Sequence, residues 1–102
     1  MILLTRHSVT RMRQRMGLPK RAALRTAAIA HRYGVEITNE SRMTRWALAN
    51  QYNRCDAHCV MHYGQFYFVF RRELSRLRLL TVITAKELPI LKKDKIYEDS
   101  RN

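Results

Sequence analysis

The sequence predicts one α+β domain in which two N-terminal helices pack on a small, mainly antiparallel sheet. Three observations indicate this fold class. Helical spacing and helix-ending residues occupy the first third of the chain, while residues 57–84 are rich in β-branched and aromatic residues. The 102 residues suffice for one hydrophobic core but not for two. A hydrophobic fraction of 46%, with only three glycines and two prolines, argues against wholesale disorder.

The first helix is expected to follow a short strand. Residues Ile2–Leu4 form an apolar run that suits a strand, and Thr5 belongs to the residue types that cap helix N-termini. Gly17 then interrupts the helical spacing. We therefore expect a helix between Thr5 and Gly17.

A second helix is predicted over Lys20–Tyr33, an alanine-rich stretch with high helix propensity. Pro19 suits its first turn and Gly34 its C-terminal cap. The small alanine side chains permit close packing on a neighbouring element. Arg21 and Arg25, four residues apart, share its outer face.

The remainder is predicted to consist mainly of strands. Residues 35–38 suit a brief strand, 39–42 a turn, and 43–51 either a short helix or an irregular insertion. Two strands over 57–63 and 66–72, joined at Gly64 and Gln65, indicate a hairpin, and 78–84 should pair as a third strand. The polar tail from Ala85 is expected to fray from about residue 94.

The charge indicates a polyanionic partner. Twenty Lys and Arg against eight Asp and Glu give a formal net charge of +12, and the first 35 residues contain no acidic residue. No apolar stretch approaches the roughly 20 residues that span a bilayer, and the apolar start is too short for a secretory signal. Two cysteines are too few for a disulfide framework. We expect a cytoplasmic protein that binds nucleic acid, not membranes.

The first helix contains a candidate phosphate site. Its residues His7, Arg11 and Arg15 are four positions apart and so share one face of the helix. Arginine offers a planar fork of donors to phosphate, and histidine can take or release a proton near neutral pH. Ribonuclease chemistry without a metal needs a proton acceptor, a proton donor and cations beside the phosphorane. His7 would serve as acid or base and the two arginines would hold the scissile phosphate. The alternative is a solvated basic face of an amphipathic helix.

The order of motifs resembles a known family. A short apolar strand, then His7, Arg11-Met12 and Arg15, a second helix, and paired strands ending in Leu80-Thr81-Val82 resemble small uncharacterised RelE-like proteins. These are grouped with the barnase, EndoU, colicin and RelE superfamily of compact ribonucleases, many of them toxins. The resemblance implies that Thr81 joins the site, on a strand facing the helix motif, where it binds or orients phosphate. By itself, Thr81 is an ordinary β-branched strand residue.

Cysteines and histidines between residues 55 and 62 raise the alternative of a zinc site. Cys55, His58, Cys59 and His62 would share one face of a helix. A strand instead puts Cys59 opposite the two histidines, so we expect no metal and no cofactor. On that strand either His58 or His62 is a candidate second proton carrier.

Aromatic and basic residues extend the candidate nucleic-acid surface. Alternation puts Phe66, Phe68 and Phe70 in the core and leaves Tyr67, and to a lesser degree Tyr63, for stacking on bases. The basic residues that we assign to nucleic-acid binding are Arg6, Arg13, Lys20, Arg21, Arg25, Arg71 and Arg72.

The leading hypothesis is a metal-independent endoribonuclease of the RelE-like type that binds RNA and acts as the toxin of a toxin-antitoxin system, opposed by an acidic antitoxin-like protein. A second hypothesis is a non-catalytic nucleic-acid-binding or regulatory protein of a mobile element. A third is a protein-interaction module, such as an inhibitor, that uses the exposed side chain of Trp46.

Overall fold

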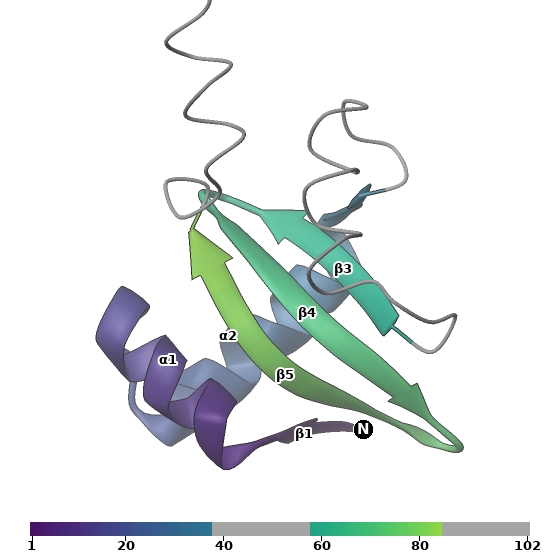
Figure 1. The fold of residues 1–102 in the computed structure, drawn as a ribbon, viewed down its shortest axis with the longest axis horizontal. Coiled ribbons are helices and arrows are strands. Elements are labelled where there is room, and N and C mark those ends of the chain that lie inside the picture. Colours follow the sequence, from purple (N-terminus) through teal and green to yellow (C-terminus); the bar gives the residue numbers. More distant parts are fainter. Residues whose placement is uncertain (38–57, 85–102) are drawn as a thin grey trace, which may run out of the picture.

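A computed structural model, which describes residues 1–37 and 58–84, confirms an α+β fold with two helices and one five-stranded sheet (Figure 1). The elements follow the chain in the order β1 (Ile2–Leu4), α1 (Arg6–Met16), α2 (Lys20–Tyr33), β2 (Val35–Glu36), β3 (His58–Tyr63), β4 (Phe66–Glu73) and β5 (Arg76–Thr84). The predictions for residues 39–51, for Trp46 and for the tail from Ala85 lie outside the described residues.

The sheet has the strand order β1-β5-β4-β3-β2. Neighbouring strands are antiparallel except at one edge, where β1 runs parallel to β5 and Ile2 lies opposite Leu77. The first and last described strands are therefore neighbours. Because β1 ends at Leu4 opposite Leu79, the part of β5 beyond Leu79 extends past β1, and α1 begins beside it (Figure 1).

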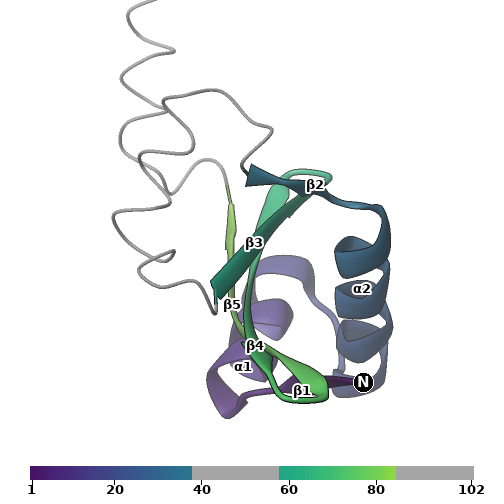
Figure 2. The same cartoon turned by 90° about the vertical axis from the view of Figure 1, so that its right-hand side faces the viewer.

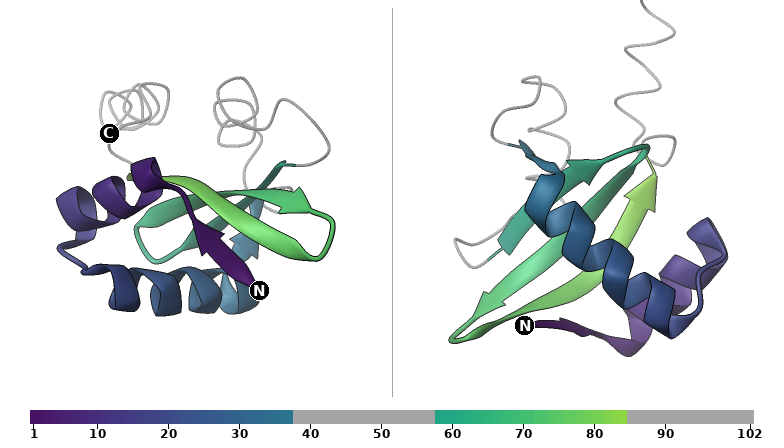
Figure 3. Two further views of the ribbon diagram at one scale, coloured as in Figure 1. Left: turned by 90° about the horizontal axis from the view of Figure 1, so that it is seen from below. Right: turned by 180° about the vertical axis from the view of Figure 1, so that it is seen from behind.

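Both helices lie on one side of the sheet. α2 crosses its face, and α1 lies toward the β5 edge (Figures 2 and 3). The alanines of α2 that face the sheet are fully buried, as their small size predicted. They pack with Met12 of α1 and with Phe68 and Phe70 of β4, all fully buried, while Phe66 is half-buried against the same cluster. This confirms the prediction that the phenylalanines of β4 form core.

The helix ends follow local residue chemistry. Gly17 ends α1 with a φ of 67°, in the left-handed region that favours glycine. Pro19 occupies the N-cap of α2, one position before the predicted first turn. Gly34 follows α2, and the position needs glycine for a different reason. A Cβ there would lie 2.4 Å from the backbone oxygen of Ala30. The chain thus passes close against the end of its own helix.

An irregularity in the β4–β5 pairing changes which face Thr81 occupies. Val69 lies opposite Thr81, but the next residue, Phe70, lies opposite Leu79, so Leu80 is an extra residue in β5. With strict alternation Thr81 would share the helix-facing side with Leu79. The bulge instead turns Thr81 to the side of Val69, which belongs to a separate apolar cluster on the other face of the sheet.

Candidate functional site

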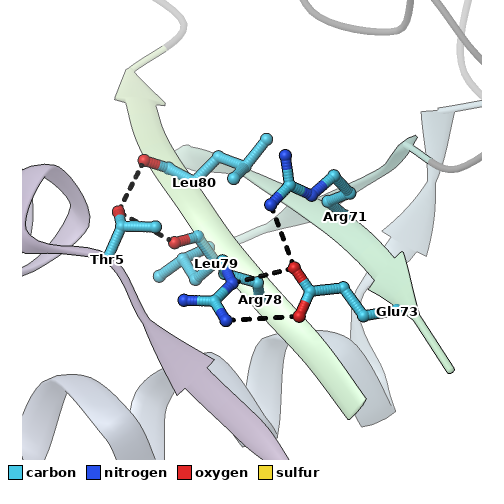
Figure 4. A network of polar contacts seen from close by, with 6 residues as sticks. All are labelled: Thr5, Arg71, Glu73, Arg78, Leu79 and Leu80. Atoms are coloured by element: carbon cyan, nitrogen blue, oxygen red, sulfur yellow. Dashed lines mark hydrogen bonds and ion pairs between the residues drawn. The ribbon is translucent and has the colours of Figure 1, made fainter. Parts of the chain in front are cut away.

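Thr5 fixes the start of α1 against β5. Its Oγ1 accepts a hydrogen bond from the backbone N–H of Ser8 at 3.0 Å, which is the N-cap contact expected from the sequence. The same hydroxyl lies 3.2 Å from the carbonyl oxygen of Leu79 and 3.3 Å from that of Leu80, to which it donates (Figure 4). The first turn of α1 is therefore held next to the residue that precedes Thr81.

His7 and Thr81 meet at this junction. Nε2 of His7 lies 3.2 Å from Oγ1 of Thr81, although the two residues are 74 positions apart in the chain. Arg11 joins them, because its Nε donates to the same Nε2 at 3.3 Å. An arginine Nε always carries a hydrogen, so this bond assigns the ring proton of neutral His7 to Nδ1 and the free lone pair to Nε2.

The predicted stripe continues along α1. Arg11 also approaches Oε1 of Gln14 at 3.5 Å. Arg15 follows one turn later on the same face, about 6 Å further along the helix axis. The structure therefore brings His7, Arg11 and Thr81 into contact and places Arg15 next along the same face. His7 is exposed, whereas Arg11 and Thr81 are half-buried.

Ser8 is a residue of this junction that the sequence reasoning missed. It is fully buried, and its Oγ donates to the backbone oxygen of Thr5 at 2.9 Å. Ser8 stands four residues before the buried Met12, a spacing that assigns it to the core-facing stripe of α1. Val9, the next residue, is only half-buried. The buried stripe of α1 therefore runs through Ser8 and Met12.

Most of the other predicted basic residues lie on the two helices and have no acidic partner in the part of the chain that the structure describes. They are exposed side chains: Arg6, Arg13, Lys20, Arg21 and Arg25. Arg21 and Arg25 extend outward from α2, as their spacing predicted. Helices α1 and α2 therefore present a basic surface whose charge remains available to a polyanion.

The prediction that Tyr67 is available to stack on a base is wrong. Its side chain is only 3% exposed, packs in the cluster with Val69 and Ile83, and stacks on the His62 ring with 4.3 Å between centroids. The prediction assumed that the sheet buries one face only, but this sheet carries apolar clusters on both faces. Tyr63, beside the β3–β4 turn, is 38% exposed.

The histidines of β3 do not reach His7. His62 lies opposite Tyr67, which in turn lies opposite Ile83 of β5, so one strand separates His62 from β5. Two strand spacings amount to about 10 Å. His58 lies further along β3, opposite Arg71. Neither histidine is therefore a partner of His7 in proton transfer.

Strand β3 also separates the proposed zinc ligands. Cys59 is buried in the core on the helix side, where desolvation raises the pKa of its thiol, and His58 and His62 point to the other face. No group of three potential metal ligands occurs within residues 1–37 and 58–84. Cys55 lies outside the described residues.

Arg71 and Arg72 point to opposite faces of the sheet, so they do not prolong one basic surface as predicted. Arg72 lies on the helix side, 3.7 Å from Oε1 of Glu36, and also donates to the backbone oxygen of His58 at 3.4 Å. Arg71 lies on the face that carries Val69. The alternation of a strand accounts for the split.

A carboxylate joins two arginines on the face that carries Thr81. Arg71 and Arg78 are directly opposite each other in the β4–β5 register. Glu73 accepts from Arg78 Nε at 2.9 Å and Nη2 at 3.3 Å, and from Arg71 Nη2 at 3.0 Å (Figure 4). These hydrogen bonds, Arg78 first, lower the pKa of Glu73 to about 2. Sequence reasoning missed Glu73 and Arg78, which only the hairpin register could have revealed.

No helix of the described residues is long and apolar enough to cross a membrane. Comparisons with family models, curated proteins and solved structures found no match for this chain.

Proposed function

We propose that this protein is a metal-independent endoribonuclease, in line with the resemblance of its motifs to RelE-like proteins. The single observation that carries the proposal is the convergence of Arg11 Nε and Thr81 Oγ1 on Nε2 of His7, at 3.3 Å and 3.2 Å. A proton acceptor, a cation and a hydroxyl thus meet on a surface with unneutralised positive charge. These are three of the groups that cleavage of RNA by its own 2′-hydroxyl requires.

In the proposed reaction, His7 acts as the general base. Its Nε2 lone pair takes the proton of a 2′-hydroxyl as that oxygen attacks the adjacent phosphorus. The P–O2′ bond forms, the P–O5′ bond breaks, and the products are a 2′,3′-cyclic phosphate and a 5′-hydroxyl. Because neutral His7 carries its other proton on Nδ1, the ring is in the tautomer that this step needs.

Arg11 and Arg15 supply the positive charge for the phosphorane. The Arg11 guanidinium exchanges its contact with His7 for a non-bridging phosphate oxygen, and Arg15 binds the same group or the next phosphate. Thr81 turns its hydroxyl hydrogen from the Nε2 lone pair of His7 to the phosphate, which leaves that lone pair free for the 2′-hydroxyl proton. The half-buried setting of Arg11 and Thr81 strengthens these contacts relative to a fully solvated site.

The leaving 5′-oxygen receives its proton from water in this scheme. In-line displacement places the attacking and leaving oxygens on opposite sides of phosphorus, so one histidine does not serve both. The distance between His7 and the histidines of β3 is the observation that favours the second candidate, a nucleic-acid-binding protein that does not cut. Both candidates predict RNA affinity that falls with salt.

Cleavage of a labelled RNA oligonucleotide in chelator separates the two candidates. We expect the wild-type protein to produce 2′,3′-cyclic phosphate ends and His7→Ala to lose about 10²- to 10⁴-fold in rate. His31→Asn is the matched control, because His31 is exposed on α2, and its rate should equal that of wild type. A substrate with one 2′-deoxy position should be bound but not cut there.

Binding without cleavage by the wild-type protein would refute the ribonuclease and leave the second candidate. Equal cleavage by wild type and His7→Ala would point to a contaminating nuclease. Arg11→Lys keeps the charge but not the planar fork, so we expect a partial loss of rate, and a complete loss in Arg11→Ala.

We further propose that the enzyme is a toxin that acts on RNA in the cytoplasm and is neutralised by an acidic protein. A basic ribonuclease without such a partner would damage the RNA of its own cell. Induced expression of the wild-type protein should arrest growth and His7→Ala should not. Equal growth of both strains at equal protein levels would refute the toxin proposal.

A further inference from the structure

We propose that Arg71 and Arg78, held by Glu73, form a second phosphate-binding subsite for the RNA strand that enters the His7 site. The inference rests on the proposed function, because it assigns a path to the same substrate. It concerns the face of the sheet that carries Thr81. Neither Arg78 nor Glu73 belongs to the catalytic group or to the basic surface of the helices.

The two arginines are placed where sheet stability alone would disfavour them. They are direct cross-strand neighbours, and like charges in that position are destabilising. Glu73 offsets the repulsion by bonding to both, yet the group of three retains a net charge of +1. One ion pair between Glu73 and a single arginine would stabilise the hairpin without placing two like charges opposite each other.

The geometry leaves donors for a ligand. A guanidinium has five N–H groups, and the bonds to Glu73 use two of Arg78 and one of Arg71. The side chains of Arg71 and Arg78 are 46% and 31% exposed. Glu73 therefore orients the two guanidinium groups without occupying them. Such fixed planar forks match the oxygens of a phosphate.

The subsite lies in line with the reaction centre. Arg78 and Thr81 are on the same strand and lie opposite Arg71 and Val69, which are two residues apart on β4, so their separation along the sheet is about 7 Å. Both of these β4 residues face away from the helices. A strand of RNA whose scissile phosphate lies at His7 and Thr81 can thus extend along β5 so that another of its phosphates meets the arginine pair.

Glu73→Gln distinguishes binding from mere stabilisation. In a phosphate subsite, removing the negative charge should raise the affinity for RNA and steepen its salt dependence, even though the hairpin becomes less stable. Glu36→Gln is the matched control, because it also removes a carboxylate that lies beside an arginine, Arg72, but on the helix side of the sheet. For a purely structural Glu73, the two variants should have equal affinity and slope.

The affinity measurement uses fluorescence anisotropy with a labelled 2′-O-methyl RNA, which is not cleaved, over a series of KCl concentrations. Arg78→Gln should flatten the slope of log affinity against log salt by about 0.7, the contribution of one single-strand phosphate. Arg32→Gln on α2 is the control for the loss of one exposed arginine. A slope for Arg78→Gln equal to that of Arg32→Gln would overturn the subsite.

Substrate length gives a second, independent test in the cleavage assay. A dinucleotide has only the scissile phosphate, so Arg78→Gln should cleave it with wild-type kcat/KM. On an RNA of eight nucleotides the same variant should lose about tenfold, which corresponds to one charge-assisted hydrogen bond. Equal losses on both substrates would show that Arg78 acts only through stability, and would overturn the proposal.

These experiments test the subsite and the ribonuclease activity separately. If the 2′-O-methyl RNA binds with the predicted slopes but natural RNA is not cut, the subsite is supported and the ribonuclease activity is refuted. If natural RNA is cut and Glu73→Gln behaves as Glu36→Gln, the ribonuclease activity is supported and the subsite is refuted. Absence of RNA binding by the wild-type protein would overturn both.

Discussion

Replacing Thr5 by valine should separate α1 from β5 while preserving the shape of the side chain. The hydroxyl accepts the N-cap bond from Ser8 and donates to the carbonyls of Leu79 and Leu80. Loss of the cap costs about 1 kcal/mol, and loss of the cross-link to β5 about 1 kcal/mol more. The backbone N–H of Thr5 still donates to the carbonyl oxygen of Leu79 at 3.3 Å, so one hydrogen bond between Thr5 and β5 remains. We expect a total loss of about 2 kcal/mol in the free energy of unfolding.

Urea denaturation measures this loss directly, and thermal unfolding should show a decrease in Tm of about 10 °C. Thr10→Val is the matched control, because its exposed hydroxyl donates only to the carbonyl of Arg6 one turn back, at 3.1 Å. That control should change stability by less than about 0.5 kcal/mol. Thr5→Ser, which keeps the hydroxyl, should recover most of the stability. Equal effects of Thr5→Val and Thr10→Val would refute the role of Thr5 as the link between α1 and β5.

The same substitution should loosen the contact between His7 and Thr81, since His7 lies in the turn that Thr5 anchors. Nitrogen NMR of the imidazole ring reports its tautomer. We expect the Nδ1–H form of His7 in wild type, because Arg11 donates to Nε2, and a mixture of tautomers in Thr5→Val. An unchanged ring in Thr5→Val would show that another contact orients His7.

Three further predictions concern the rest of the fold. The pKa of Glu73 is lowered to about 2, so its contribution to stability is complete above its ordinary value near 4.5 and is lost as the pH falls from there through 2. The unfolding free energy of Glu73→Gln should therefore be less sensitive to pH in that interval, and parallel curves for both proteins would contradict the ion-pair network. In urea denaturation, Gly34→Ala should lower the free energy of unfolding more than Gly17→Ala does. The new Cβ at position 34 would lie 2.4 Å from a backbone oxygen, whereas the one at position 17 meets no atom. Gly17→Ala should cost only about 1 to 2 kcal/mol, because alanine is strained in the left-handed conformation. The reverse order would contradict the close approach at Gly34. In a Cys55→Ser background, the buried Cys59 thiol, whose pKa is raised by desolvation, should react with a disulfide reagent at pH 8 only as fast as the protein unfolds, and immediate reaction would contradict its burial.

Local residue chemistry was sufficient to predict the helices. Thr5 caps α1 and Gly17 ends it, and α2 has the bounds Lys20–Tyr33 that its composition predicted. These signals act over one or two turns of chain, where backbone propensity and capping dominate. The strand segments were predictable for a similar reason, since β-branched and aromatic residues cluster between turn residues. The assignment of Phe68 and Phe70 to the core followed from alternation alone.

Other features depended on which segments meet in space. The pairing of β1 with β5, the bulge at Leu80 and the burial of Tyr67 have no local signal, because each depends on the partner strand or on what covers a face. Alternation predicts that neighbouring residues point to opposite faces, but not that both faces are apolar. The arginine pair bridged by Glu73 likewise exists only in the register of the β4–β5 hairpin.

By itself, then, the sequence determined the helices, the strands, the charge and the stripe of His7, Arg11 and Arg15, because each is a property of short range or of composition. The tertiary structure alone decided that Thr81 lies 3.2 Å from His7, across 74 residues of chain, and that strand β4 separates the histidines of β3 from β5. The physical reason is that the pairing of a parallel edge strand and the formation of a β-bulge depend on packing between distant segments. Together they place the hydroxyl of Thr81 against the first turn of α1, which creates the candidate site.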